Sequence, residues 1–244
     1  MAEADSDPRG LAAEGGGAPT GGDGFVLGAE PGALDLLLRE PGTLLAGFDG
    51  PGRPRGLSQI VLLAIGGHFA YGLVMASFAG GMQWWAVPLK VLVAAATCAA
   101  ICFPSLYILV CLSGARARVP QVASMLASLV ALSAVFLAGA APIVWVFSQS
   151  SNLTSFMGAV HLLAWLVSIA AAARILTRGL RHWRARHPEW GGLWLMIFVV
   201  TSLQMATVLR PMVGPASGLL EPERRFFLQH WLSTISQDVH ASGD

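Results

Sequence analysis

Acidic residues are almost absent from the middle of this 244-residue chain. No Asp or Glu occurs between Asp49 and Glu189, and charged residues make up 12% of the sequence against 55% hydrophobic residues. Soluble domains carry about 25% charged residues, so a long acid-free apolar tract indicates a membrane protein. The same absence argues against the carboxylate rings of cation channels and the carboxylate proton relays of pumps.

Cysteine is also rare. Cys98, Cys102 and Cys111 all fall within or at the end of one apolar segment, so they cannot form the disulfide framework of a secreted protein. Cys98 and Cys102 are spaced to share a helix face, but a metal or redox pair would need His68 or His161 at the same depth. We therefore expect small buried side chains here and no metal site.

Signatures of soluble catalysis are missing from the sequence as well. It contains no phosphate-binding glycine loop, no nucleophile elbow and no metal-binding histidine pair with an adjacent glutamate. An intramembrane protease or transferase would need an acid, a Ser–His pair or a metal site that the sequence does not assemble. We expect a protein that is not an enzyme and that holds no cofactor.

The N-terminal residues lack the basic start and the apolar run of a secretory signal. Residues 1–31 include runs such as Gly15-Gly16-Gly17 and bury too little apolar surface to offset the entropy cost of ordering them. We expect a disordered cytoplasmic tail. The first membrane span must then serve as the insertion signal.

Five apolar stretches are long enough to cross a bilayer, whose hydrocarbon core of about 30 Å requires roughly 20 helical residues. Clusters of turn-forming or charged residues separate them. The sequence thus predicts an all-α fold, a polytopic membrane helix bundle with five transmembrane helices within residues 57–209. The predicted transmembrane helices are Leu57–Ala79, Ala86–Leu112, Pro120–Phe147, Ser155–Leu176 and Gly191–Leu209.

Basic residues alternate strictly between the predicted loops. They precede the first span and occupy the joins between spans two and three and between spans four and five, whereas the other two joins contain no Lys or Arg. Short loops rich in Lys and Arg stay on the cytoplasmic side during insertion. The pattern predicts a cytoplasmic N-terminus and an external or lumenal C-terminus, in what we expect to be a bacterial inner membrane.

Tryptophan positions agree with this topology, because an indole favours the boundary of a bilayer. Trp84, Trp85 and Trp145 would mark the outer boundary, and Trp183 and Trp190 the inner one. Trp165 falls nearer mid-span, where we expect it to pack inside the bundle.

Two amphipathic segments flank the predicted spans. In residues 32–56 leucines cluster over a length too short to cross a bilayer, which favours one short interfacial helix. In residues 210–244 apolar residues recur every four positions from Phe227 to Val239, which is helical periodicity. We expect this external tail to contain an amphipathic helix that lies on the membrane or docks on a partner.

Polar side chains at membrane depth are costly unless they are paired, so each is a candidate for function. His68 lies near the middle of the first span, and the others lie toward the outer half. Those others could converge on one crevice with cationic and amide donors and no carboxylate, which would favour an anion. Alternatively, they snorkel or make interhelical hydrogen bonds that only stabilise packing. The candidates are His68, Lys90, His161, Gln204 and Arg210.

A cluster of arginines continues the fourth span into the following loop, at spacings that place several guanidinium groups on one side of a helix. Its main role is expected to be topological, but it would also meet anionic headgroups on the cytoplasmic side, at about 1 kcal/mol per basic residue. So short a run does not predict nucleic-acid binding. The candidate headgroup contacts are Arg174, Arg178, Arg181, Arg184 and Arg186.

A long cytoplasmic N-terminus, five closely spaced spans and an external C-terminus together resemble the Yip family of membrane proteins. Phe48-Asp49-Gly50-Pro51 looks like a degraded form of that family's Asp-Leu-x-Gly-Pro element, and only Phe103-Pro104 corresponds to its Gly-Tyr-Pro element. The region from Gln204 to Trp231 is similar to uncharacterised bacterial five-span proteins. In eukaryotes the Yip family acts with small GTPases in membrane traffic, so the resemblance implies a membrane-organising or trafficking-like role.

Two classes of function are consistent with these observations. The first is a membrane scaffold or accessory subunit of a membrane complex, which works through its terminal segments with a protein partner or as a homo-oligomer. The second is a pore or carrier for a small anionic solute, which works through the outer polar residues. We favour the scaffold, because a carrier normally has a conspicuous binding site near the midplane, where His68 is the one deep ionisable group.

Overall fold

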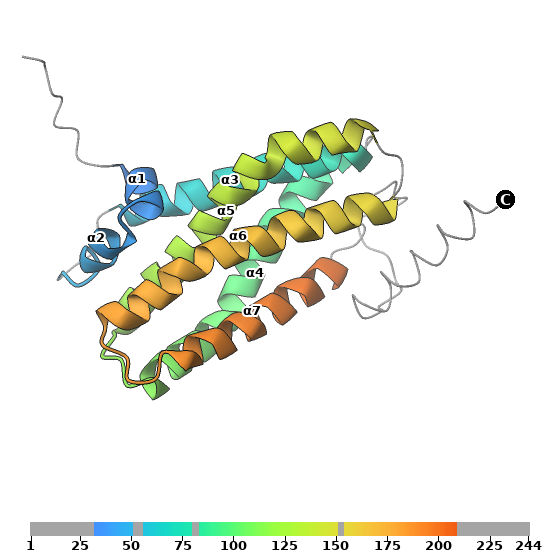
Figure 1. Cartoon of the computed structure of the whole chain (residues 1–244). Helices are drawn as coiled ribbons and strands as arrows, with labels where there is room; N and C mark the ends of the chain where they lie inside the picture. The colour runs from blue at the N-terminus through green and yellow to red at the C-terminus, as the bar shows by residue number, and fades with distance from the viewer. Residues whose placement is uncertain (1–31, 51–55, 80–82, 151–153, 209–244) are drawn as a thin grey trace, which may run out of the picture. The chain divides into compact units, whose positions relative to one another are not determined.

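The computed structural model describes residues 32–50, 56–79, 83–150 and 154–208, which all belong to one compact unit. Every regular element among these residues is an α-helix, and five of the helices are long and apolar enough to cross a membrane. The chain is therefore an integral, multi-pass membrane protein with an all-α fold, as predicted. The five helices are α3 (Leu57–Ala79), α4 (Gln83–Leu112), α5 (Val119–Ser150), α6 (Thr154–His182) and α7 (Glu189–Val208) (Figure 1).

Helices α4 to α7 extend beyond the apolar stretches that predict them. The clearest cases are α4, which begins at Gln83 instead of Ala86, and α6, which ends at His182 instead of Leu176. The six added residues, 177–182, include Arg178, Leu180 and Arg181, which are strong helix formers even where the apolar pattern has stopped, together with Gly179, which favours a helix much less. The first arginines of the cluster therefore lie on the helix itself, as the sequence predicts.

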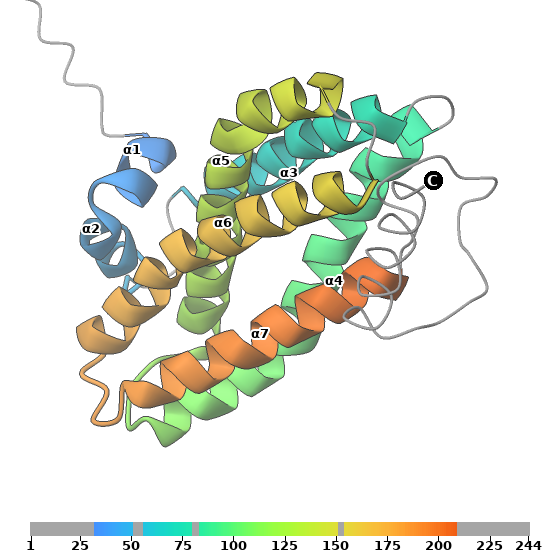
Figure 2. The same cartoon turned by 45° about the vertical axis from the view of Figure 1, so that its right-hand side comes forward.

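The order of the helices in space differs from their order in the chain. Helix α3 packs against both α4 and α5, α5 packs against α6, and α7 packs mainly against α4. Both views show α7 running alongside α4 (Figure 1, Figure 2). The last helix thus returns to the second transmembrane helix and makes few contacts with its immediate predecessor, α6.

Glycines allow α3 to approach its two neighbours closely. A Cβ atom added at Gly67 would lie 2.7 Å from the carbonyl oxygen of Ala134 on α5, and one added at Gly72 would lie 2.6 Å from the Cα atom of Pro88 on α4. Small residues at such crossings let membrane helices gain dispersion energy from close backbone contact.

Helices α4 and α7 are joined near Pro104, one of the two prolines inside α4. Pro104 removes a backbone donor, and the nearby carbonyl of Cys102 accepts hydrogen bonds from the Ser105 hydroxyl (2.8 Å) and from the indole N–H of Trp194 (3.1 Å). Trp194 is fully buried, and both Cys98 and Cys102 are buried as predicted. Within the described part of the chain, no group of three or more His, Cys, Asp or Glu residues is placed to hold a metal ion.

The segment before α3 forms two short helices, α1 (Ala33–Leu38) and α2 (Pro41–Ala46). The prediction of one helix is wrong, because Pro41 starts α2 and disfavours helical geometry at the residue before it. Both helices pack onto the transmembrane bundle, and their buried residues in its main hydrophobic cluster include Leu37, Leu44 and Leu45.

Trp165 packs inside the bundle, as predicted. It is half-buried and touches both hydrophobic clusters of the described residues. The two predicted terminal features, the disordered tail of residues 1–31 and the amphipathic helix of residues 210–244, lie outside the described residues and stay predictions.

Candidate functional site

His161 on α6 is paired with Tyr71 on α3. The tyrosine hydroxyl and Nδ1 of the histidine are 2.9 Å apart, and the two rings meet edge to face at 88° with their centroids 5.7 Å apart. Both side chains are buried within an apolar cluster that includes Met75 and Met157. Tyr71 was not among the predicted residues, although it follows His68 by about one helical turn.

The Tyr71–His161 pair leaves one ring nitrogen unused. Nε2 of His161 is buried and has no hydrogen-bond partner within the described part of the chain. Whichever group donates in the hydrogen bond, Nε2 is then either an unpaired N–H or an unpaired acceptor. An unsatisfied buried polar group costs about 1–3 kcal/mol, so the pair fixes α3 against α6 at some cost in stability.

Lys90 and Gln204 occupy other helices. Lys90 on α4 is buried, and Gln204 on α7 is half-buried. Each interacts with other groups of the protein. Arg210 lies outside the described residues, so the convergence of these side chains with His161 on one crevice stays a prediction.

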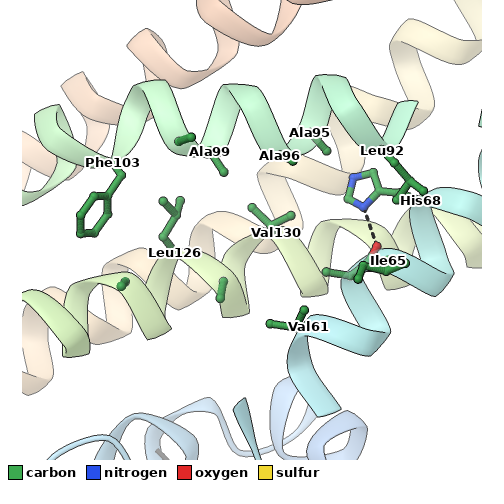
Figure 3. Close-up of a pocket in the computed structure, with 14 residues that line it drawn as sticks. Val61, Ile65, His68, Leu92, Ala95, Ala96, Ala99, Phe103, Leu126 and Val130 are labelled. Atoms are coloured by element: carbon green, nitrogen blue, oxygen red, sulfur yellow. Dashed lines mark hydrogen bonds between the residues drawn. The ribbon is translucent and has the colours of Figure 1, made fainter. Parts of the chain in front are cut away.

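His68 lines a crevice between α3, α4 and α5 (Figure 3). The crevice has a volume of about 590 Å³, and every other residue that lines it is apolar. Nδ1 of His68 donates a hydrogen bond to the carbonyl oxygen of Ala64, one turn earlier on α3, at 2.9 Å. His68 and His161 thus belong to different surroundings, one in an apolar crevice and the other in a packed cluster.

One carboxylate joins three segments at the end of the bundle where α6 finishes. Oδ1 of Asp49 accepts a hydrogen bond from Nε2 of Gln121 at 2.6 Å and a longer one from the indole N–H of Trp183 at 3.4 Å. Oδ2 accepts from Nε2 of His182 at 2.7 Å. Oε1 of Gln121 in turn accepts from the backbone N–H of Arg118 (2.6 Å), just before α5. We call Asp49 with Gln121, His182 and Trp183 the Asp49 clamp.

The Asp49 clamp is not predicted from the sequence, although Asp49 is the last acidic residue before the long acid-free tract. A carboxylate so close to the first span could have signalled a partner, because few other acids are available to the basic residues at that end. Trp183 was predicted to face the inner membrane boundary. It is buried beside Asp49, and its indole N–H donates to the carboxylate, while its position relative to a bilayer stays a prediction.

The five arginines of the predicted cluster are all exposed. Arg184 has a φ angle of 53°, and the next N–H, that of Ala185, donates to the carbonyl of Leu180 at 2.9 Å. This left-handed turn ends α6. On the helix itself, the guanidinium carbon of Arg174 lies 5.5 Å from the ring centroid of Phe136, a distance at which cations attract aromatic faces.

A second basic loop lies beside this cluster. The backbone N–H of Arg186 donates to the carbonyl of Ser113 at 2.8 Å, which joins the α6–α7 connection to the α4–α5 connection. The latter carries Arg116 and Arg118, both exposed. Basic residues from two loops therefore gather at the end of the bundle that also holds the Asp49 clamp.

The fold and these sites define an integral membrane protein whose described residues include five helices long and apolar enough to cross a membrane. No protein-family model, curated protein or solved structure matches the chain. The resemblance to the Yip family therefore stays a prediction from the sequence.

Proposed function

We propose that the protein is a non-catalytic scaffold or accessory subunit of a membrane complex. The observation that best supports this role is the Asp49 clamp, which holds the end of the α1–α2 segment against the ends of α5 and α6. A simple tether would not need such an anchor. A segment held rigidly loses less entropy when a partner binds it, so α1 and α2 are suited to presenting a fixed surface.

The exposed side of α1 is where we propose that a protein partner binds. Leu34 and Leu38 are 43% and 42% exposed and lie one helical turn apart, so they form a small apolar ridge. Asp35 and Arg39 form an exposed ion pair of 3.2 Å at the same helix. An apolar centre with a charged rim is typical of protein interfaces.

The basic loops at the end of the bundle that holds the Asp49 clamp are also part of the proposed function. We place the arginine cluster on the cytoplasmic side of a bacterial inner membrane, where it binds anionic lipid headgroups. The Yip-like order of segments supports a membrane-organising role in that setting. A partner could then contact the protein and the headgroups together.

The surroundings of His68 and His161 favour a scaffold over an anion carrier. His161 is bonded to Tyr71 inside an apolar cluster, and His68 is bonded to its own helix in an apolar crevice. Hydrogen bonds between membrane helices fix their packing. A path for a hydrated anion would instead need polar groups that replace its water.

Purification of the full chain in mild detergent tests the scaffold proposal. We expect a stoichiometric protein partner that binds the Asp49→Ala variant more weakly, because α1 and α2 are then held to the bundle only by their buried leucines and are less rigid. Glu189→Ala is the matched control, since Glu189 is also an exposed acidic residue that pairs with a histidine, His187, at 2.9 Å, but lies at the start of α7 and outside the proposed interface on α1. A partner that binds Asp49→Ala as tightly as the unmodified protein would contradict the role of the clamp.

Flux measurements on the pure protein in liposomes test the alternative. We expect no chloride flux above that of protein-free liposomes. Anion flux that disappears in Lys90→Ala or His161→Ala would overturn the scaffold proposal in favour of a carrier.

A further inference from the structure

The crevice beside His68 exists because α4 presents small side chains to its neighbours. Ala95, Ala96 and Ala99 cannot fill the space between α4 and the larger side chains of α3 and α5 (Figure 3). The resulting volume of about 590 Å³ falls within the range of about 300–1,000 Å³ that small-molecule sites occupy. An apolar lining with a small number of polar groups is also typical of such sites.

The hydrogen bond between His68 and Ala64 determines whether the other ring nitrogen of His68 can donate or accept a hydrogen bond. The carbonyl oxygen of Ala64 can only accept, so Nδ1 of His68 must carry the proton of the bond between them. In the neutral imidazole Nε2 is then a hydrogen-bond acceptor. Among the described residues the ring bonds only through Nδ1, and Figure 3 shows it between α3 and the alanines of α4, with the second nitrogen on the side of the ring away from the dashed hydrogen bond.

The crevice opens toward the face of the protein that the membrane covers. Val61 and Ile65, which line it, are 41% and 49% exposed. His68 lies at the centre of α3, roughly 16 Å from each end of the helix at 1.5 Å per residue. The headgroup of a phospholipid stays near the bilayer surface, so it cannot bring a donor to this depth.

We propose that the crevice binds an apolar, membrane-dissolved molecule that carries a hydroxyl group, and that the hydroxyl donates to Nε2 of His68. The apolar body of the ligand would occupy the space along the α4 alanines. Long-chain secondary alcohols and apolar phenols belong to this class. The site is independent of the scaffold role, because the Asp49 clamp contributes no residue to the crevice lining.

Photo-crosslinking of the full-length protein in phosphatidylethanolamine–phosphatidylglycerol vesicles tests the site. The probes are a diazirine-bearing long-chain secondary alcohol with its hydroxyl near mid-chain and the methyl ether of the same molecule, which lacks the donor. We expect crosslinks on α3, α4 and α5, with the alcohol labelling more strongly by about 3- to 10-fold, the effect of one neutral hydrogen bond. Equal labelling by alcohol and ether in the unmodified protein would overturn the proposal.

Three variants assign the effect to the crevice and to the ring. His68→Phe removes the acceptor and keeps a ring, so the alcohol should label no better than the ether, whereas His161→Phe, outside the crevice, should keep the preference. Ala99→Phe should fill the crevice and reduce labelling by both probes. A preference that persists in His68→Phe, or crosslinks confined to helices other than α3, α4 and α5, would contradict the assignment.

Discussion

The contact between α3 and α5 at Gly67 leads to a quantitative prediction. A Cβ atom at this position would lie 2.7, 2.8 and 2.9 Å from the carbonyl oxygen, the carbonyl carbon and the Cβ atom of Ala134. Two of these atoms belong to the backbone and cannot rotate away. The adjacent Gly66 is exposed, and a Cβ added there would meet nothing within 4 Å among the described residues. The two glycines therefore form a matched pair.

The expected energies follow from two opposing terms. Replacing a helical glycine by alanine stabilises the helix by about 0.5–1 kcal/mol, because alanine loses less backbone entropy on folding. Gly66→Ala should show this gain alone. Gly67→Ala has the same gain but must also push α3 and α5 apart by roughly 0.5–1 Å to restore ordinary contact distances, at an overpacking cost of about 1–3 kcal/mol. The gain in helix propensity is the same in both variants. The difference between their free energies of unfolding therefore measures the overpacking cost alone.

Unfolding of the purified protein, followed by circular dichroism during titration with a denaturing detergent, measures this difference. We expect Gly67→Ala to unfold with a free energy about 1–3 kcal/mol lower than that of Gly66→Ala. Gly72→Ala should behave like Gly67→Ala, since its Cβ would lie 2.6 Å from the Cα atom of Pro88. If Gly67→Ala were as stable as Gly66→Ala, the close approach of α3 and α5 would not contribute to the fold as argued.

Three further predictions concern the helix ends and the loops between them. Single cysteines at Ala117 and Gln149 in a cysteine-free background should react with an impermeant label from opposite sides of the membrane, and labelling from one side would contradict the five-span topology. Arg184→Gly should raise the free energy of unfolding by about 1 kcal/mol, because glycine adopts the left-handed conformation at φ 53° without strain; a lower value would mean that side-chain contacts of Arg184 outweigh the strain. Neutralising Arg181, Arg184 and Arg186 together to Gln should weaken phosphatidylglycerol retention in native mass spectrometry by about 1 kcal/mol per charge, while Lys at the same positions should preserve it. Unchanged retention with Gln would leave the cluster a purely topological role.

The five transmembrane helices could be predicted from the sequence because their length and hydropathy are local properties that the bilayer imposes. The continuation of α6 through its arginines could be predicted for a similar reason, since the helix propensity of Arg178, Leu180 and Arg181 is a local property. The break between α1 and α2 also has a local cause, because Pro41 disfavours helical geometry at the residue before it. This break could therefore be predicted from the sequence, although our prediction had one helix.

The partners of the polar side chains were decided only by the tertiary structure. Tyr71 and His161 are 90 residues apart, and Asp49 and His182 are 133 residues apart, so both pairs depend on which helices become neighbours. In a soluble bundle the apolar stripe of each helix identifies its buried face. In a membrane both the lipid-facing and the buried faces are apolar, so periodicity does not distinguish them.

The two adjacent glycines of α3 show the same distinction between what the sequence determines and what depends on the tertiary structure. Gly66 and Gly67 are equivalent in the sequence, as two small residues in one apolar stretch. Composition alone determined that this stretch spans the bilayer, because transfer of apolar side chains into hydrocarbon does not depend on what they touch. Only the packing of α3 against the backbone of Ala134 decided that one glycine is required and the other is replaceable, because steric exclusion depends on atoms distant in the chain.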